Sequence, residues 1–143
     1  MIEKYIDQFK KINVAKRDGL KAPHKAVLLL AVIDLVERGV FTTPKIELIE
    51  ELEFAYQNTW DRYVYNTQTF QPRLTTPFWH LSNEDFWRLR TYSGQPVSET
   101  DNASSVKSMR EKIYALLDVV LFEELKKTEN RAKLRVTLIS NYF

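Results

Sequence analysis

Four basic side chains precede the most apolar run of the sequence: Arg17, Lys21, His24 and Lys25. The run itself, Ala26 to Ile33, contains no polar residue, so it predicts a helix that is buried on all sides. We expect this helix to span Pro23 to Arg38, because proline suits a first helical turn and Gly39 suits a C-terminal stop. The basic side chains would then surround the N-terminus of the central helix.

This arrangement favours anion binding. A helix N-terminus carries unpaired N–H groups and a partial positive charge, and both attract a phosphate. Phosphate contacts set the register of a nucleic acid only when their scaffold is rigid, which a buried helix provides. We therefore predict that Arg17, Lys21, His24 and Lys25 bind a DNA backbone. The alternative is that His24 packs locally and that the lysines are ordinary surface charge.

The distribution of charge along the chain bears on the same point. The net charge is only +2, yet the segment from Lys10 to Lys25 carries six lysines and arginines against one acid, Asp18. The segment from Ala26 to Asp85 is acidic by contrast. Segregated basic charge is typical of a phosphate-binding surface, although a solvated face can show the same pattern.

The second candidate group is the segment Thr76-Pro77-Phe78-Trp79-His80. Large apolar and polar residues alternate here and again after a short polar stretch. This pattern predicts a β-hairpin in which Phe78 to Leu81 pairs with Phe86 to Arg90. The aromatic side chains should mostly fill the core. Pro77, at the entry of the strand, could present its ring on the surface as one wall of a shallow apolar cup.

A catalytic site is not predicted. The chain has two histidines, His24 and His80, and no cysteine, so neither a multi-histidine metal site nor a Cys/His nucleophilic pair can be assembled. The three glycines stand alone, which excludes a Gly-rich phosphate loop. Neighbouring acids such as Glu50 and Glu51 fit the solvated face of a helix. We expect a binding domain without a cofactor or a metal.

The remaining pattern predicts the elements that hold these residues. Apolar residues at helical spacing indicate helices from Ile2 to Ile12, from Thr43-Pro44 toward Trp60, from Val106 through Leu117 to Leu125, and from Thr128 to Ile139, with loops over Asn66 to Thr76 and Ser93 to Ser105. The expected fold class is α+β: mainly helical with a small β-hairpin, compact, winged-helix-like in plan, and built around the buried central helix.

Length and composition indicate one domain, residues 1–143, because 143 residues can bury a core of ordinary size. No cysteine, signal peptide or membrane-length apolar run is present, so we expect an intracellular, cytoplasmic protein that does not enter a membrane. The apolar ending Asn141-Tyr142-Phe143 suggests a domain that belongs to a longer protein.

Three stretches together resemble a known family: Arg17 to Val36, Pro77 to Trp87, and Ala115 to Phe143. They are similar to the sulfur-binding domain of phosphorothioate-dependent restriction endonucleases of the HNH class. The resemblance implies a bacterial or archaeal module that binds double-stranded DNA in which sulfur replaces a non-bridging phosphate oxygen. It also implies that the nuclease domain lies outside this chain.

The resemblance assigns roles to individual residues. Arg17, His24 and Lys25 match the basic positions that hold the DNA backbone, and Lys21 is added because it lies nearby in the sequence. Thr76, Pro77 and Phe78 match the sulfur cavity.

The chain departs from the family pattern in two places. Relatives often carry an aromatic residue where this chain has Thr76, which makes the apolar wall smaller. The loop from Thr91 to Val106 contains no Arg or Lys, so base reading would fall to Asn102, Gln95 or a serine.

The sequence also leaves open two other functions and the formation of a homodimer. The domain could read ordinary or base-modified DNA, or it could be a protein-interaction domain whose exposed aromatic residues contact a partner. Salt separates the last of these from the others, because phosphate contacts make affinity fall steeply with salt concentration and a hydrophobic interface does not.

Overall fold

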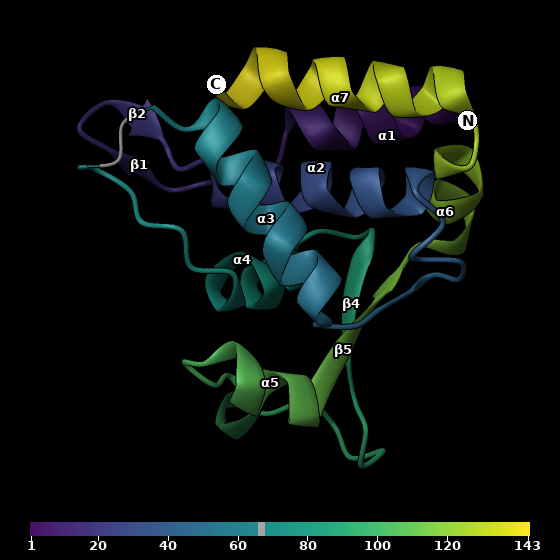
Figure 1. Cartoon of the computed structure of the whole chain (residues 1–143). Helices are drawn as coiled ribbons and strands as arrows, with labels where there is room; N and C mark the ends of the chain where they lie inside the picture. Colours follow the sequence, from purple (N-terminus) through teal and green to yellow (C-terminus); the bar gives the residue numbers. More distant parts are fainter. Residues whose placement is uncertain (66–67) are drawn as a thin grey trace.

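The computed structural model describes residues 1–65 and 68–143 (Figure 1). Its elements, in chain order, are α1 (Ile2–Lys10), β1 (Lys16–Arg17), β2 (Leu20–Lys21), α2 (His24–Glu37), β3 (Lys45–Ile46), α3 (Glu50–Tyr63), α4 (Thr75–His80), the 3-10 turn η1 (Leu81–Asn83), β4 (Trp87–Thr91), the 3-10 turn η2 (Glu99–Asp101), α5 (Val106–Lys112), β5 (Ile113–Leu117), α6 (Val119–Leu125) and α7 (Thr128–Tyr142). The predicted α+β class, mainly helical, is confirmed.

Helix α2 is the centre of the molecule, as predicted. Every residue from Ala26 to Ile33 is buried, and Pro23 and Gly39 stand at its two ends. Gly39 has a φ of 75°, a left-handed conformation that ends helices at low cost only for glycine. Helices α1 and α7 lie along one side of α2 and α3 crosses another (Figure 1). The N-terminus of α2 is therefore fixed by the core.

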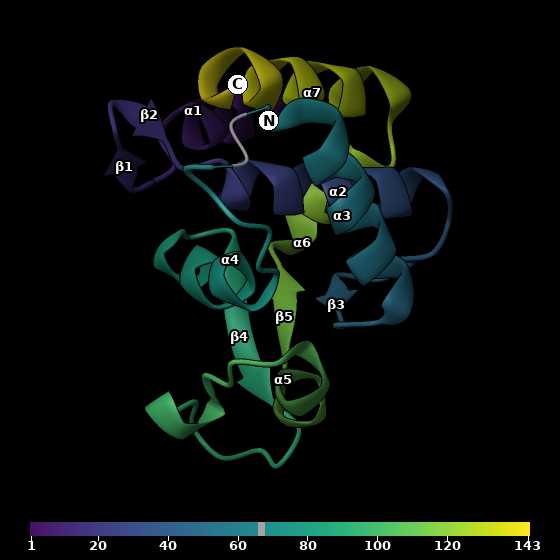
Figure 2. The same cartoon turned by 60° about the vertical axis from the view of Figure 1, so that its left-hand side comes forward.

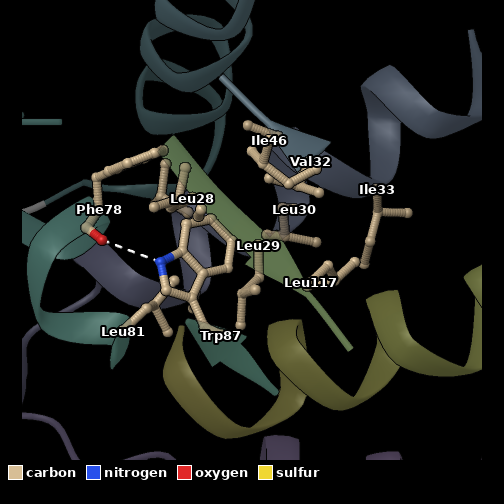
Figure 3. Close-up of a cluster of buried hydrophobic side chains, with 14 of the residues drawn as sticks. Leu28, Leu29, Leu30, Val32, Ile33, Ile46, Phe78, Leu81, Trp87 and Leu117 are labelled. Atoms are coloured by element: carbon tan, nitrogen blue, oxygen red, sulfur yellow. Dashed lines mark hydrogen bonds between the residues drawn. The ribbon is translucent and has the colours of Figure 1, made fainter. Parts of the chain in front are cut away.

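A three-stranded antiparallel sheet has the order β3-β5-β4, and its side chains Ile46, Trp87 and Leu117 lie in one buried cluster with residues from the middle of α2 (Figure 3). Trp87 pairs with Leu117, and Leu89 pairs with Ala115. These side chains alternate with exposed ones along β4 and with partly buried ones along β5, which is the pattern of a half-buried sheet.

The predicted hairpin of Phe78 to Leu81 with Phe86 to Arg90 is wrong. Phe78 to His80 lie in α4, Leu81 begins η1, and strand β4 pairs instead with the distant strand β5. Phe78 and Leu81 are three residues apart and both are fully buried, so they form one face of a helical turn. Over four residues, apolar spacing fits a strand and a helix equally well.

Two of the helix predictions were also wrong in part. Strand β5 interrupts the helix that was expected from Val106 to Leu125, because Ile113, Ala115 and Leu117 are buried at period two. The third helix begins at Glu50 and not at Thr43-Pro44, since Lys45–Ile46 form the short edge strand β3. In both places the sheet pairing decides the local structure.

The segment around Asp18 forms a short β-hairpin. Strands β1 and β2 pair Arg17 with Leu20, and Asp18 and Gly19 form the turn with φ values of 55° and 78°. Two successive positive φ values are typical of the type I′ turn, which matches the twist of a two-residue hairpin. The hairpin raises the basic segment away from the helices (Figure 1).

The ends of the chain are tied together. Tyr142 of α7 accepts a 3.0 Å hydrogen bond from the Ile12 backbone N–H and donates one of 2.5 Å to the Phe9 carbonyl oxygen.

Of the predicted loop Asn66 to Thr76, residues 66 and 67 lie outside the described residues, and Thr75 and Thr76 already belong to α4. No helix in the described residues is long and apolar enough to cross a membrane.

Candidate nucleic-acid interface

An open cavity of about 760 Å³ lies between the β1–β2 hairpin, the N-terminus of α2 and helix α4. Figures 1 and 2 show the hairpin and α4 on the same side of the molecule, with the chain before α4 running between them. The cavity is lined by Asn13, Val14, Ala15, Lys16, Arg17, Ala22, His24, Lys25, Phe70, Gln71, Arg73, Thr76, Pro77, His80 and Asn83. None of these described lining residues is acidic.

The cavity brings together five of the eight predicted site residues: Arg17, His24, Lys25, Thr76 and Pro77. They come from two segments about fifty residues apart in the sequence, and they meet because α4 packs against α2. Along the sequence, the basic cluster and the Pro77 segment are separate groups. The structure makes them two walls of one site.

His24 forms the floor of the cavity. One ring nitrogen, Nε2, lies 2.8 Å from the Gln71 carbonyl oxygen, and the ring packs against Trp60 and Phe70 with centroid distances of 4.9 and 5.9 Å. Burial lowers the pKa of His24 below its usual value, and the positive charges of Arg17 and Arg73 lower it further against the opposing effect of the Gln71 carbonyl. The imidazole is therefore neutral at pH 7 in the free domain, with Nε2–H donating to Gln71.

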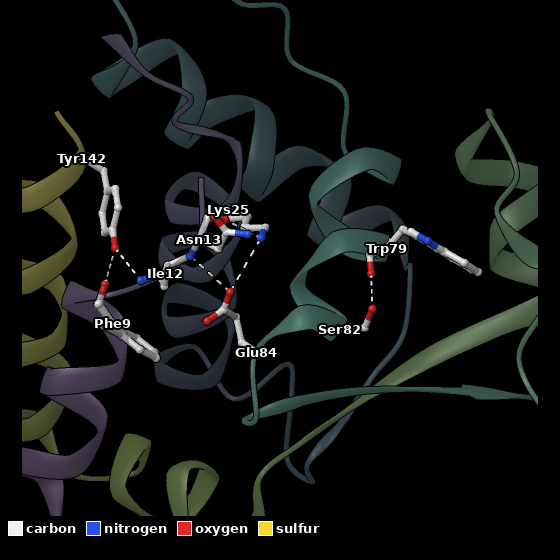
Figure 4. A network of polar contacts seen from close by, with 8 residues as sticks. All are labelled: Phe9, Ile12, Asn13, Lys25, Trp79, Ser82, Glu84 and Tyr142. Atoms are coloured by element: carbon white, nitrogen blue, oxygen red, sulfur yellow. Dashed lines mark hydrogen bonds and ion pairs between the residues drawn. The ribbon is translucent and has the colours of Figure 1, made fainter. Parts of the chain in front are cut away.

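Lys25 is held by the protein itself (Figure 4). Its Nζ donates a 2.6 Å hydrogen bond to the Asn13 carbonyl oxygen and lies 3.7 Å from Glu84 Oε2, which also accepts a hydrogen bond from the Asn13 backbone N–H. The side chain is only 11% exposed. Burial lowers the pKa of Lys25, and the Glu84 carboxylate opposes that change. Lys25 thus supplies positive charge to the cavity and also anchors the segment before β1.

Three further cations lie around His24 and Lys25. Arg17 and Lys16 extend from β1 and are exposed, and Arg17 donates a 3.2 Å hydrogen bond to the Thr69 carbonyl oxygen. Arg73, exposed just before α4, was not predicted as a site residue. Positive charge gathered in a concave surface attracts an anion more strongly than the same charge spread over a flat one.

The apolar part of the lining comes from Val14, Ala15, Ala22, Phe70 and Pro77. Pro77 is the third residue of α4 and not the first residue of a strand, and little of its ring is exposed. Proline is tolerated there because the first turn of a helix needs no N–H donor. Thr76, next to it, is exposed. The cavity therefore offers an apolar wall beside a group of cations.

Three predicted site residues do not line the cavity. Lys21 donates to the Asn141 carbonyl oxygen at 3.0 Å and lies 5.2 Å from the Tyr142 ring centroid. Phe78 is fully buried against Trp87, whose Nε1 donates to the Phe78 carbonyl oxygen at 3.0 Å (Figure 3). Asn102 is exposed after η2, outside the cavity.

The structure adds residues that sequence reasoning missed, chiefly Arg73, His80 and Asn83. Thr76, His80 and Asn83 are spaced by four and three residues, which places them on one face of α4 and η1, and Arg73 lies just before α4 at the same spacing. This spacing was the available signal, but it was missed because Arg73 and Thr76 fell in a predicted loop and His80 in a predicted strand.

A cationic cavity with an apolar wall and no acidic lining is a site for an anionic ligand, and its position on a rigid helical core is typical of a nucleic-acid-binding domain. Comparison with protein families bears this out: the chain matches the family of ScoMcrA-like DNA sulfur-binding domains over residues 2–143. It belongs to that family, and it is thus a DNA-binding domain and not a catalytic one. A search of curated proteins found no match.

Proposed function

We propose that the cavity between the hairpin and α4 binds a backbone phosphate of double-stranded DNA in which sulfur replaces one non-bridging oxygen. The observation that carries the proposal is the joint lining of one cavity by cations and apolar groups, with Arg17 and His24 on one side and Pro77 on the other. The family to which the chain belongs supports it.

The two kinds of lining suit the two properties of a phosphorothioate. The group keeps its negative charge, so nearby cations stabilise it as they would a phosphate. Sulfur is larger and a poorer hydrogen-bond acceptor than oxygen, so contact with an apolar wall costs less desolvation for sulfur than for oxygen. The cations therefore provide affinity for any backbone, and Pro77 with its apolar neighbours provides the preference for sulfur.

We further propose that the domain is the recognition part of a restriction endonuclease that acts in the cytoplasm of a bacterium or archaeon. In this view residues 1–143 form one DNA-recognition domain and the HNH nuclease domain lies outside this chain. Family membership and the cationic cavity support the binding role. Incubation of this domain with phosphorothioate plasmid and divalent metal ions should leave the plasmid intact.

The deciding experiment is a titration of three matched duplexes that differ at a single linkage. One carries plain phosphate, and the other two carry a phosphorothioate of either stereochemistry. We expect one stereoisomer to bind more tightly than the plain duplex, because only one orientation directs sulfur toward Pro77. Equal affinity for all three duplexes would contradict sulfur recognition and would favour a general DNA-binding domain. Binding that does not weaken with salt would favour a protein-interaction domain.

A further inference from the structure

The cavity is larger than one phosphate requires. Its volume of about 760 Å³ falls in the range that accommodates a whole drug-sized ligand, roughly 300 to 1,000 Å³. A single phosphorothioate would leave much of this space empty. Consecutive phosphates of one DNA strand are only about 3.4 Å apart along the helix axis, so the linkage beside the modified one can enter the same cavity.

The basic groups stand on two separate walls. Lys16 and Arg17 belong to the hairpin, whereas Arg73 and His80 belong to the segment of α4. Arg17 and Arg73 each act on the ring of His24, whose pKa both of them lower. One cation from each wall therefore acts on the same group of the cavity, the ring of His24.

Helix α4 can serve as a rigid support. Its face opposite the cavity is buried through Thr75, Phe78 and Leu81, and the indole of Trp87 is hydrogen-bonded to its backbone. Thr76 and His80 on the other face line the cavity, as does Arg73 from the segment just before α4. A guanidinium and an imidazole N–H can both donate to one phosphate, and the guanidinium does so with full positive charge.

On the basis of the proposed function above, we propose that Arg73 and His80 form a second phosphate subsite, which binds the phosphate adjacent to the phosphorothioate. Arg17 and His24 then hold the modified linkage, and α4 sets the direction in which the strand leaves the cavity.

The test is a double-mutant cycle between protein and DNA. In a phosphorothioate duplex, the linkage on the 5′ or the 3′ side of the modification is replaced by an uncharged methylphosphonate. For the parent domain, one of these two replacements should weaken binding on the order of tenfold, as for loss of a hydrogen bond between charged groups. For Arg73→Ala the same replacement should have little effect, because its partner is already absent. His80→Ala should show the same coupling to a smaller extent.

Lys127→Ala is the matched control. Lys127 is an exposed cation between α6 and α7, at the opposite end of the molecule from the hairpin (Figure 1), so this variant should keep the full tenfold effect. Equal losses in the parent and in Arg73→Ala would overturn the second subsite, as would a parent domain that tolerates both replacements. Circular dichroism verifies folding, and Arg73→Lys, which keeps the charge, should restore part of the coupling.

The outcomes also separate this inference from the proposed function. The same cycle is measured on duplexes with plain phosphate at the central linkage. Coupling to Arg73 without any preference for sulfur would retain the subsite and refute sulfur recognition. A preference for sulfur without coupling to Arg73 would support sulfur recognition and refute the second subsite.

Discussion

Lys25 Nζ lies 3.7 Å from Glu84 Oε2, and the Asn13 backbone bridges the two by bonding to both. This contact joins the first turn of α2 to the end of η1 and to the chain that enters β1. Lys25 is therefore part of the support of the cavity as well as a charge within it. The positive charge of Lys25 could be predicted from the sequence, but its contacts with Asn13 and Glu84 could not.

The first prediction follows from this contact. Lys25→Ala leaves the Asn13 carbonyl oxygen, whose hydrogen bond with Lys25 is partly buried, and the Glu84 carboxylate without their cation, so it should lower the free energy of unfolding by about 1 to 3 kcal/mol. Urea denaturation measures this change. Lys11→Ala, which removes a cation from an exposed ion pair with Asp7, is the control and should cost less than about 1 kcal/mol. Equal effects of the two variants would mean that the Asn13 and Glu84 contacts are not stabilising.

Arg17 should act through DNA binding and not through stability. Its guanidinium is exposed, and its Thr69 contact is a surface hydrogen bond. If it binds a phosphate, Arg17→Ala should lower the slope of log K against log salt by about one unit. Lys25→Ala should lower the slope less, because Glu84 already balances part of that charge. An unchanged slope in Arg17→Ala would show that this residue does not contact the backbone.

Pro77 should determine the preference for sulfur. Pro77→Ser keeps a residue that the first turn of α4 tolerates, but it replaces the apolar ring with a hydroxyl. We expect the affinity for the phosphorothioate duplex to fall by about 1 to 2 kcal/mol while that for plain DNA stays nearly constant. Thr76→Tyr should raise the ratio of the two affinities by enlarging the apolar wall. Equal losses on both duplexes in Pro77→Ser would count against this role.

His24 should make folding and binding respond to pH in opposite directions. Its pKa in the folded domain is lowered, chiefly by burial, from a usual value of 6.5. As pH falls below 6.5, the unfolded chain takes up a proton that the folded domain resists, so the free energy of unfolding should decrease. A bound phosphate favours the charged imidazole, so DNA affinity should increase over the same range.

The variant His24→Gln tests both effects, since it removes the titrating group. Denaturation and binding are measured at pH 7.5 and at steps below pH 6.5, where the ring of the parent begins to charge. The variant should lose the His24 part of both dependences. A variant whose two pH profiles match those of the parent would exclude His24 as their source.

Trp87 should govern the position of α4. Its indole is fully buried and donates a 3.0 Å hydrogen bond to the Phe78 carbonyl oxygen. Trp87→Phe removes that donor and leaves a small void, so we expect a loss of about 2 to 4 kcal/mol in the free energy of unfolding. Trp79→Phe is the matched control, because Trp79 is only partly buried. A smaller loss for Trp87→Phe than for Trp79→Phe would contradict this anchoring role.

The amino-acid sequence by itself determined the parts of this protein that depend on local periodicity and on residue type. The eight consecutive apolar residues from Ala26 to Ile33 can be satisfied only inside a core, so the central helix and its basic N-terminus were predictable. Arg17, His24 and Lys25 could be chosen for the same reason, because their positions relative to that helix are fixed within a few residues.

Only the tertiary structure decided the elements whose local pattern is ambiguous. Residues Phe78 to Leu81 and Ile113 to Leu117 are short apolar runs that fit a helix and a strand equally well, and the outcome depends on pairing between β4 and β5 and on packing against α2. The cavity depends on the same long-range contacts. Arg73 and Pro77 line the same cavity as His24 because α4 packs on α2, a relationship that no spacing along the chain specifies.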